Sequence, residues 1–85
     1  MSFESPVDLN LFVSQVRAEL ETAGFHAAAD RFAAIQGAVF TTGSEWLGEL
    51  GAAVNEIRAT CMLPVDLDGK LERIKGAVRC VWPTL

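Results

Sequence analysis

The chain has 85 residues, of which 51% are hydrophobic and 21% charged, and its formal net charge is −4. This length suits one small domain, and the apolar content is too high for a disordered chain. The excess of acidic residues argues against a general nucleic-acid binder, whose affinity depends on neutralising phosphates. A domain this small buries only about 60% of its surface, so the apolar content predicts that part of the surface meets another chain.

The first predicted helix spans residues 6–23. Ser5 can cap its start, Pro6 suits the first helical position, and Gly24 can end it in a left-handed conformation. Leu11 lies outside the apolar stripe of this helix. The residues that form the stripe at helical spacing are Leu9, Phe12, Val13, Val16 and Leu20.

The second predicted helix spans residues 25–36 and is rich in alanine, which favours a helix and allows close packing. The residues that share its apolar face are Phe25, Ala28, Ala29, Phe32 and Ile35. Gly37 ends the helix. The connector of residues 38–41 includes Val39 and Phe40, and we expect its apolar side chains to close the core.

The third predicted helix spans residues 43–60 and begins with a capping box made by Thr42 and Glu45. Its apolar stripe consists of Trp46, Leu47, Leu50, Val54, Ile57 and Cys61. The opposite face is nearly all small, with Gly48, Gly51, Ala52, Asn55 and Ala59. Such a face allows another helix to approach closely, and it is equally compatible with a surface bare to solvent.

The fourth predicted helix spans residues 66–82. Pro64 disfavours a helical conformation at the preceding residue, and Asp66 or Asp68 can cap the new helix. Pro83 ends it. Its apolar stripe consists of Leu67, Leu71, Ile74, Val78, Val81 and Trp82.

These elements predict an all-α chain, a compact antiparallel four-helix bundle with short loops that forms a single helical domain over residues 1–85. The longest uncharged run, residues 32–44, is too short and too interrupted by glycine to cross a bilayer. The first residues lack the basic and apolar regions of a secretory signal. We therefore expect a cytoplasmic protein.

The sequence contains few residues suited to chemistry. His26 and Asp30 are four residues apart on one helix and could orient a general base, but an exposed surface pair is the favoured explanation. Cys61 is expected to pack in the core, and Cys80 to be a partly exposed thiol. With a single histidine and no nucleophile placed beside it, we predict no enzymatic activity, no metal and no cofactor.

An acidic edge beside the small face is the predicted binding surface. The carboxylates of the third helix lie at helical spacing on one side of it, and a solvated acidic edge is the plain alternative. The predicted partner-binding residues are Glu45, Gly48, Glu49, Gly51, Ala52, Asn55 and Glu56. After the stripes are buried, the apolar residues left over are Phe3, Leu11, Met62 and Leu85, and Trp82 at the end of its stripe is a further candidate.

A series of caps and core positions carries a family resemblance. They are Leu20-x-x-Ala23-Gly24, Ala29-x-x-Phe32, Thr42-Gly43-Ser44-Glu45-Trp46-Leu47, Leu50, Ile57, Leu63-Pro64 and the amphipathic helix of residues 67–81. On these positions the chain resembles small uncharacterised bacterial all-helical proteins of the immunity-protein-like kind. Such proteins often lie beside polymorphic toxins or secreted effectors, so the resemblance implies an immunity role.

We therefore predict a small acidic helical protein-binding module, such as an immunity protein or an inhibitor that neutralises a partner toxin or effector with a basic surface. The alternative is a self-associating helical scaffold or regulatory module. A DNA-binding helix-turn-helix is disfavoured, because the connector at residues 37–42 is too long and the next helix begins with acidic residues. We expect a protein partner, neither nucleic acid nor membrane, and a monomer or homodimer.

Overall fold

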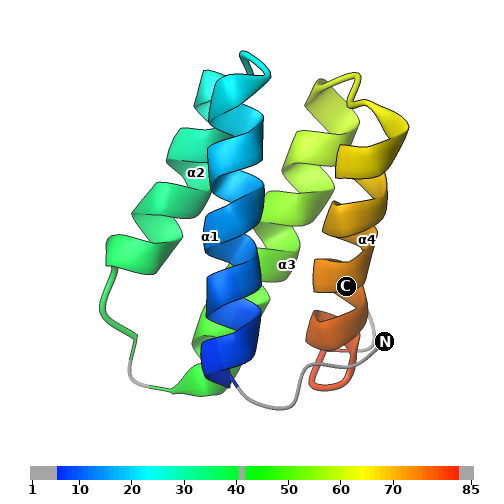
Figure 1. Cartoon of the computed structure of the whole chain (residues 1–85). Coiled ribbons are helices and arrows are strands. Elements are labelled where there is room, and N and C mark those ends of the chain that lie inside the picture. Colours follow the sequence, from blue (N-terminus) through cyan, green and yellow to red (C-terminus); the bar gives the residue numbers. More distant parts are fainter. Residues whose placement is uncertain (1–5, 41, 83–85) are drawn as a thin grey trace.

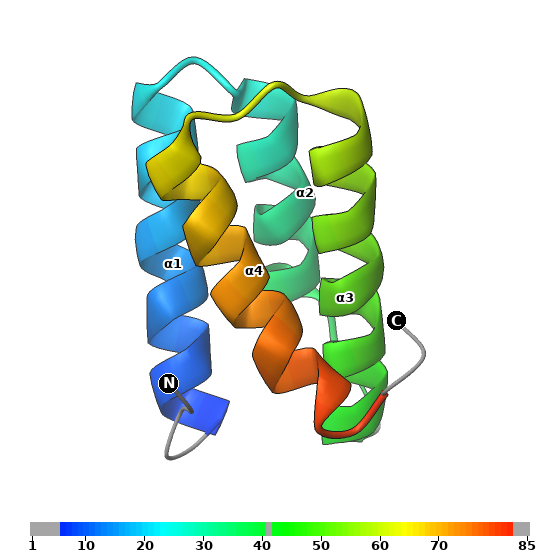
Figure 2. The ribbon, with the colours of Figure 1, turned by 90° about the vertical axis from the view of Figure 1, so that its right-hand side faces the viewer.

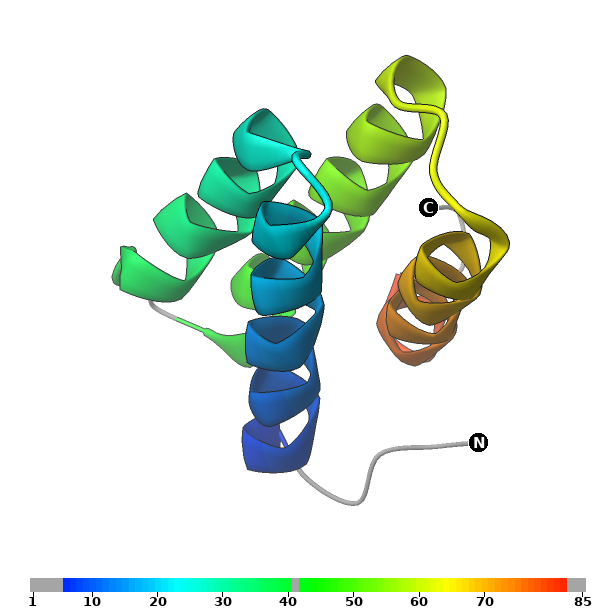
Figure 3. The ribbon, with the colours of Figure 1, turned by 45° about the horizontal axis from the view of Figure 1, so that its top comes forward.

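A computed structural model describes residues 6–40 and 42–82 of the chain. Within them the chain forms four α-helices, which are α1 (Pro6–Thr22), α2 (His26–Gly37), α3 (Gly43–Thr60) and α4 (Val65–Arg79). Successive helices run in opposite directions and are joined by short loops (Figure 1). Each of α2 and α4 packs against both α1 and α3 (Figure 2, Figure 3). The predicted all-α, compact antiparallel four-helix bundle is confirmed.

One apolar stripe from each helix forms the core, largely as the helical periodicity predicts. Among the described residues, every fully buried side chain is apolar. The buried residues are Leu9, Val13, Val16, Leu20, Ala28, Ala29, Phe32, Ile35, Leu50, Ala53, Val54, Ile57, Leu67, Leu71, Ile74 and Val78. Burial of these stripes away from water is what holds the helices side by side.

Two predicted helix boundaries are confirmed in detail. The hydroxyl of Thr42 accepts a hydrogen bond from the backbone N–H of Glu45 at 3.2 Å, which caps the start of α3. Gly24 follows the end of α1 with φ +91°, a conformation that glycine adopts without the steric cost of a side chain. Ser5, the predicted cap of α1, lies outside the described residues.

The start of α4 lies within one residue of the prediction, but the predicted aspartate cap is wrong. Neither Asp66 nor Asp68 caps this helix through its side chain, because the helix already begins at Val65 with Pro64 as its N-cap. The carbonyl of Pro64 accepts a hydrogen bond from the N–H of Asp68 at 2.9 Å. Both aspartates instead lie in the first turn, where negative charge interacts favourably with the helix dipole.

The predicted end of α4 is also wrong. The helix ends at Arg79, and Val81 and Trp82 are 44% and 40% exposed rather than part of the core stripe. The N–H groups of both residues still bond to the carbonyl of Val78, at 3.0 and 2.8 Å, and close a final turn. The indole N–H of Trp82 donates to the carbonyl of Ser44 at 2.7 Å, so this side chain packs on the beginning of α3.

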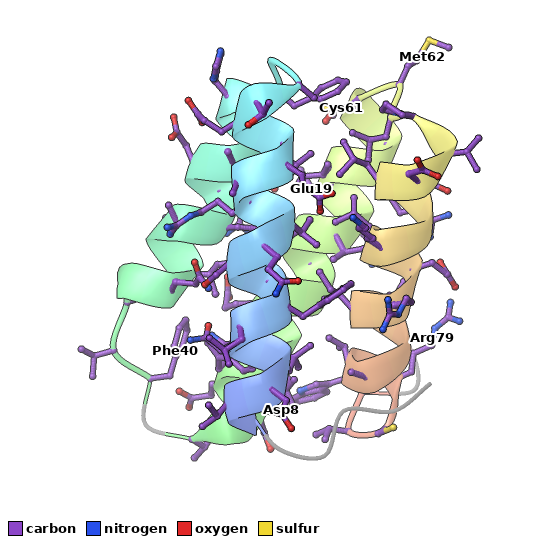
Figure 4. All side chains as sticks on the ribbon, in the orientation of Figure 1. Asp8, Glu19, Phe40, Cys61, Met62 and Arg79 are labelled. Carbon is purple, nitrogen blue, oxygen red and sulfur yellow. The ribbon has the colours of Figure 1, made fainter. Side chains whose placement is uncertain are left out.

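Among the described connector residues 38–40, only Phe40 helps to close the core. Phe40 is half-buried and packs against the core, whereas Val39 is 98% exposed and Ala38 is exposed too. Figure 4 shows Phe40 at the lower end of the bundle and Met62 pointing away from its upper end. Met62 is 97% exposed, as predicted for a leftover apolar residue.

One arginine links α3 to α4 on the solvent side of their contact. Arg58 donates from Nε to Asp68 at 3.0 Å and from Nη1 to Glu72. The hydrogen bond to Asp68 is the main reason that the pKa of the Arg58 guanidinium lies above its ordinary value. Arg79 adds a longer ion pair to Glu72, with 3.9 Å between Nη1 and Oε1.

Candidate partner-binding face

The outward face of α3 follows from the way this helix buries its apolar stripe. Leu50, Val54 and Ile57 are fully or almost fully buried, which directs the acidic residues of the opposite side toward solvent. The prediction that Gly51 belongs to the open face is wrong, because the buried side of α3 is wider than the predicted stripe and includes this glycine. The structure therefore gathers the predicted face on one helix. Its members differ, however, in how much of each remains available to a partner.

The acidic edge is shared with an arginine of α2. The guanidinium of Arg31 lies 3.1 Å from a carboxylate oxygen of Glu56 and 3.8 Å from one of Glu49. The side chains of Glu49 and Glu56 are still 53% and 59% exposed. Glu45 is exposed in the first turn of the same helix. Three carboxylates and one guanidinium give this edge a formal charge of −2.

Arg31 is the residue of the candidate face that the sequence analysis missed. It is a partly exposed member of α2 that lies next to the buried stripe residue Phe32. A residue at the border of an apolar stripe faces the neighbouring helix, so its position could have indicated a partner on α3. The identity of that partner depends on the rotation of α2 against α3, which local periodicity does not fix.

Some of the small residues of the predicted face are covered by other parts of the same chain. A Cβ atom at Gly48 would lie 3.4 Å from the indole Nε1 of Trp82, so the side chain of Trp82 covers this glycine. Gly51 is buried, Asn55 is half-buried and Ala52 is exposed. The part of the face open to a partner is therefore centred on Ala52 and the acidic edge.

Replacing Gly48 tests how closely Trp82 packs. Gly48→Ala is expected to raise the free energy of unfolding by up to about 1 kcal/mol, since alanine favours a helix and its Cβ makes ordinary contact here. Gly48→Leu is expected to displace the indole and break its bond to Ser44. Fluorescence in a Trp46→Phe background, where Trp82 is the sole tryptophan, reports this displacement, and thermal unfolding reports stability.

The control for this pair is Gly76→Leu on α4, because an added Cβ at Gly76 meets nothing within 4 Å. It should leave the emission of Trp82 unchanged. Equal emission in the Gly48→Leu variant and its parent would contradict the packing described here.

The other residues considered for catalysis or metal binding do not form a site. His26 Nδ1 lies 2.7 Å from Glu21 rather than beside Asp30, and both partners are more than half exposed. Cys61 is half-buried against the core, and Cys80 is exposed with its sulfur 3.7 Å from the carbonyl of Gly76. No three His, Cys, Asp or Glu residues of the described segments are grouped so that they could hold a metal ion.

A second surface feature lies between the first turns of α1 and the end of α2. It is an open pocket of about 320 Å³ with the apolar side chains of Val7, Leu11, Ile35, Ala38 and Trp46 in its walls. Val7 and Leu11 are 67% and 57% exposed. The exposure of Leu11 is as predicted, whereas Phe3 and Leu85 lie outside the described residues.

Comparisons with protein-family models, curated proteins and solved structures found no match to this chain. The resemblance to immunity-protein-like helical proteins thus stays a prediction. Within the described segments, none of the helices has the length and apolar character that crossing a bilayer requires.

Proposed function

We propose that this chain is a small acidic protein-binding module that acts in the cytoplasm by covering a basic surface of a partner, as an immunity protein covers a toxin or effector. The observation that supports this proposal is the acidic edge of α3. There, Glu49 and Glu56 share the single guanidinium of Arg31, which leaves the face negative. The free thiols of Cys61 and Cys80 suit a reducing compartment.

The edge has properties that favour binding to a basic partner. Its carboxylates are carried by a helix that is held rigidly by the core residues Leu50, Val54 and Ile57, so the charges are preorganised. Negative potential on such a surface steers a positively charged partner toward it and speeds association. The exposed Ala52 leaves space for a partner side chain to approach the backbone between the acidic residues.

Charge reversal tests the proposal directly. The tagged chain is used to isolate its partner from the source cells, and the affinity of the purified pair is measured by calorimetry at two salt concentrations. The variant with Glu49→Lys and Glu56→Lys is expected to bind at least about tenfold more weakly. The affinity of the unmodified chain is expected to fall as salt screens the attraction.

The matched control reverses two carboxylates on other helices. Glu21→Lys with Asp66→Lys makes the same change in net charge on α1 and α4, and it is expected to leave affinity within about threefold, since distant exposed charges are screened. Circular dichroism verifies that both double variants are folded. Equal loss of affinity in the two double variants, or retention of full affinity in the α3 variant, would refute the assignment of this face.

A further inference from the structure

The turn after α4 brings an aromatic ring to the outward face of α3. The end of α4 lies beside the beginning of α3 (Figure 2). The indole N–H of Trp82 donates to the carbonyl of Ser44 at 2.7 Å, and its ring atoms lie 3.4 to 3.9 Å from the place that a Cβ at Gly48 would take. Two contacts, one helical turn apart on α3, therefore hold the indole in place.

The ring is held but not covered. Trp82 is 40% exposed, and it is the single exposed aromatic side chain in the part of the chain that the structure describes. A side chain that its own protein already fixes loses little conformational entropy when a partner binds to it. Tryptophan is also among the residues that contribute most to binding at protein interfaces.

Two carboxylates of the partner-binding face lie on one flank of the indole. The ring contacts Ser44 and Gly48. The residues that follow these two in the chain are Glu45 and Glu49. Since successive residues of a helix are turned by about 100°, both glutamates lie on the same side of the ring. That side faces α2, because Arg31 of α2 lies 3.8 Å from Glu49.

The same acidic edge already binds one guanidinium. Arg31 lies 3.1 Å from Glu56 and 3.8 Å from Glu49, and both glutamate side chains remain more than half exposed. Three carboxylates against one guanidinium leave the edge with an excess of negative charge, which attracts a further cation.

Links between other helices lack this combination of ring and carboxylates. Gln36 of α2 donates to the side chains of Asn10 and Ser14 of α1, at 2.9 Å each. Lys70 of α4 pairs with Glu19 of α1. Neither link has an exposed aromatic side chain beside it among the described residues. The first turns of α3 are therefore the part of the surface best suited to a cation.

We propose that an arginine side chain of the protein partner binds between the indole of Trp82 and the carboxylates of Glu45 and Glu49. This inference rests on the proposed function and specifies the chemistry of the partner. A guanidinium stacks on the face of an indole and pairs with carboxylates through its planar edge, whereas a lysine ammonium is a compact point charge. The site therefore favours arginine over lysine and over neutral side chains.

A tetra-arginine peptide with blocked ends tests the site without the natural partner. Calorimetry measures its affinity, and NMR follows the indole N–H of Trp82. This signal is expected to shift during the titration, and the peptide is expected to bind about threefold more tightly than a tetra-lysine peptide. A tetra-citrulline peptide, which is similar in shape but uncharged, should not bind. Equal binding of the arginine and citrulline peptides would overturn the proposal.

Fluorinated tryptophan distinguishes a cation on the ring from an apolar contact. In the Trp46→Phe background, incorporation of monofluorinated and then tetrafluorinated tryptophan changes Trp82 alone. Fluorine withdraws electron density from the ring face and barely alters its shape. Affinity for the arginine peptide is therefore expected to fall at each step, by about threefold in total. An affinity that fluorination leaves unchanged or increases would contradict the stacking contact.

Trp82→Leu removes the ring and is expected to weaken binding of the arginine peptide about threefold. Val81→Ala is the matched control, because Val81 is 44% exposed in the same turn and has no ring. This variant should keep full affinity, and equal losses in both variants would count against the arginine site. Circular dichroism verifies that both are folded.

The natural partner, isolated as described above, separates this inference from the proposed function. An affinity that depends on Glu49 and Glu56 but not on fluorination of Trp82 would refute the arginine site and leave the proposed function standing. An affinity that depends on neither would refute both.

Discussion

Replacing Phe32 by alanine is expected to lower the free energy of unfolding by about 3–5 kcal/mol. Phe32 is the largest of the fully buried side chains, with no solvent-exposed surface. Its removal forfeits the burial of the ring and leaves a cavity that the surrounding helices fill only in part. Since small domains are commonly stable by about 5–15 kcal/mol, this change is expected to remove a large share of the free energy of unfolding. Urea unfolding followed by circular dichroism measures the effect.

Phe40→Ala is the matched control for this prediction. Phe40 is also a phenylalanine packed against the core, but it is only partly buried and belongs to the connector before α3. Its replacement is expected to cost clearly less than that of Phe32, because water already reaches part of the ring. Similar losses in both variants would show that the core is not centred on Phe32.

Enlarging Ala53 to leucine is expected to destabilise the bundle by about 1–3 kcal/mol. Ala53 is fully buried on α3, so three additional carbon atoms must push neighbouring side chains or the helix itself out of place. The adjacent residue Ala52 is exposed, and Ala52→Leu is expected to change stability by no more than about 0.5 kcal/mol. Thermal unfolding of the two variants, measured side by side, gives the difference.

These two substitutions also separate folding from binding. Ala52→Leu adds bulk to the middle of the proposed partner-binding face, so it is expected to weaken partner binding while the bundle stays folded. If Ala52→Leu destabilises the chain as much as Ala53→Leu, the rotation of α3 described here is wrong.

The buried stripes could be predicted from sequence because they depend on local periodicity. In α1, for example, Leu9, Val13 and Leu20 repeat at the spacing of a helix, and all are buried. The start of α3 could be predicted for a similar reason. A threonine that accepts the N–H three residues ahead is an interaction within one turn of chain.

The residues that local patterns misplaced respond to distant parts of the chain. Trp82 continues the apolar spacing of α4, yet its indole is held by the carbonyl of Ser44 at the start of α3. Arg31 likewise binds glutamates of another helix. Val39 is exposed whereas Phe40 is half-buried. Nothing in the connector's own sequence distinguishes these two apolar residues, so their different burial could not be predicted. The contacts between helices, and therefore the part of the candidate face that stays open, could be identified only from the three-dimensional structure.

The amide of Gln36 has a consequence for the behaviour of the bundle at high salt. Dissolved ions screen the surface ion pairs that link α3 and α4 to their neighbours. The hydrogen bonds of Gln36 on α2 to Asn10 and Ser14 on α1 join uncharged groups, so salt does not screen them in this way. Added salt is therefore expected to weaken the links between helices unevenly and to leave α1 and α2 the most firmly joined pair.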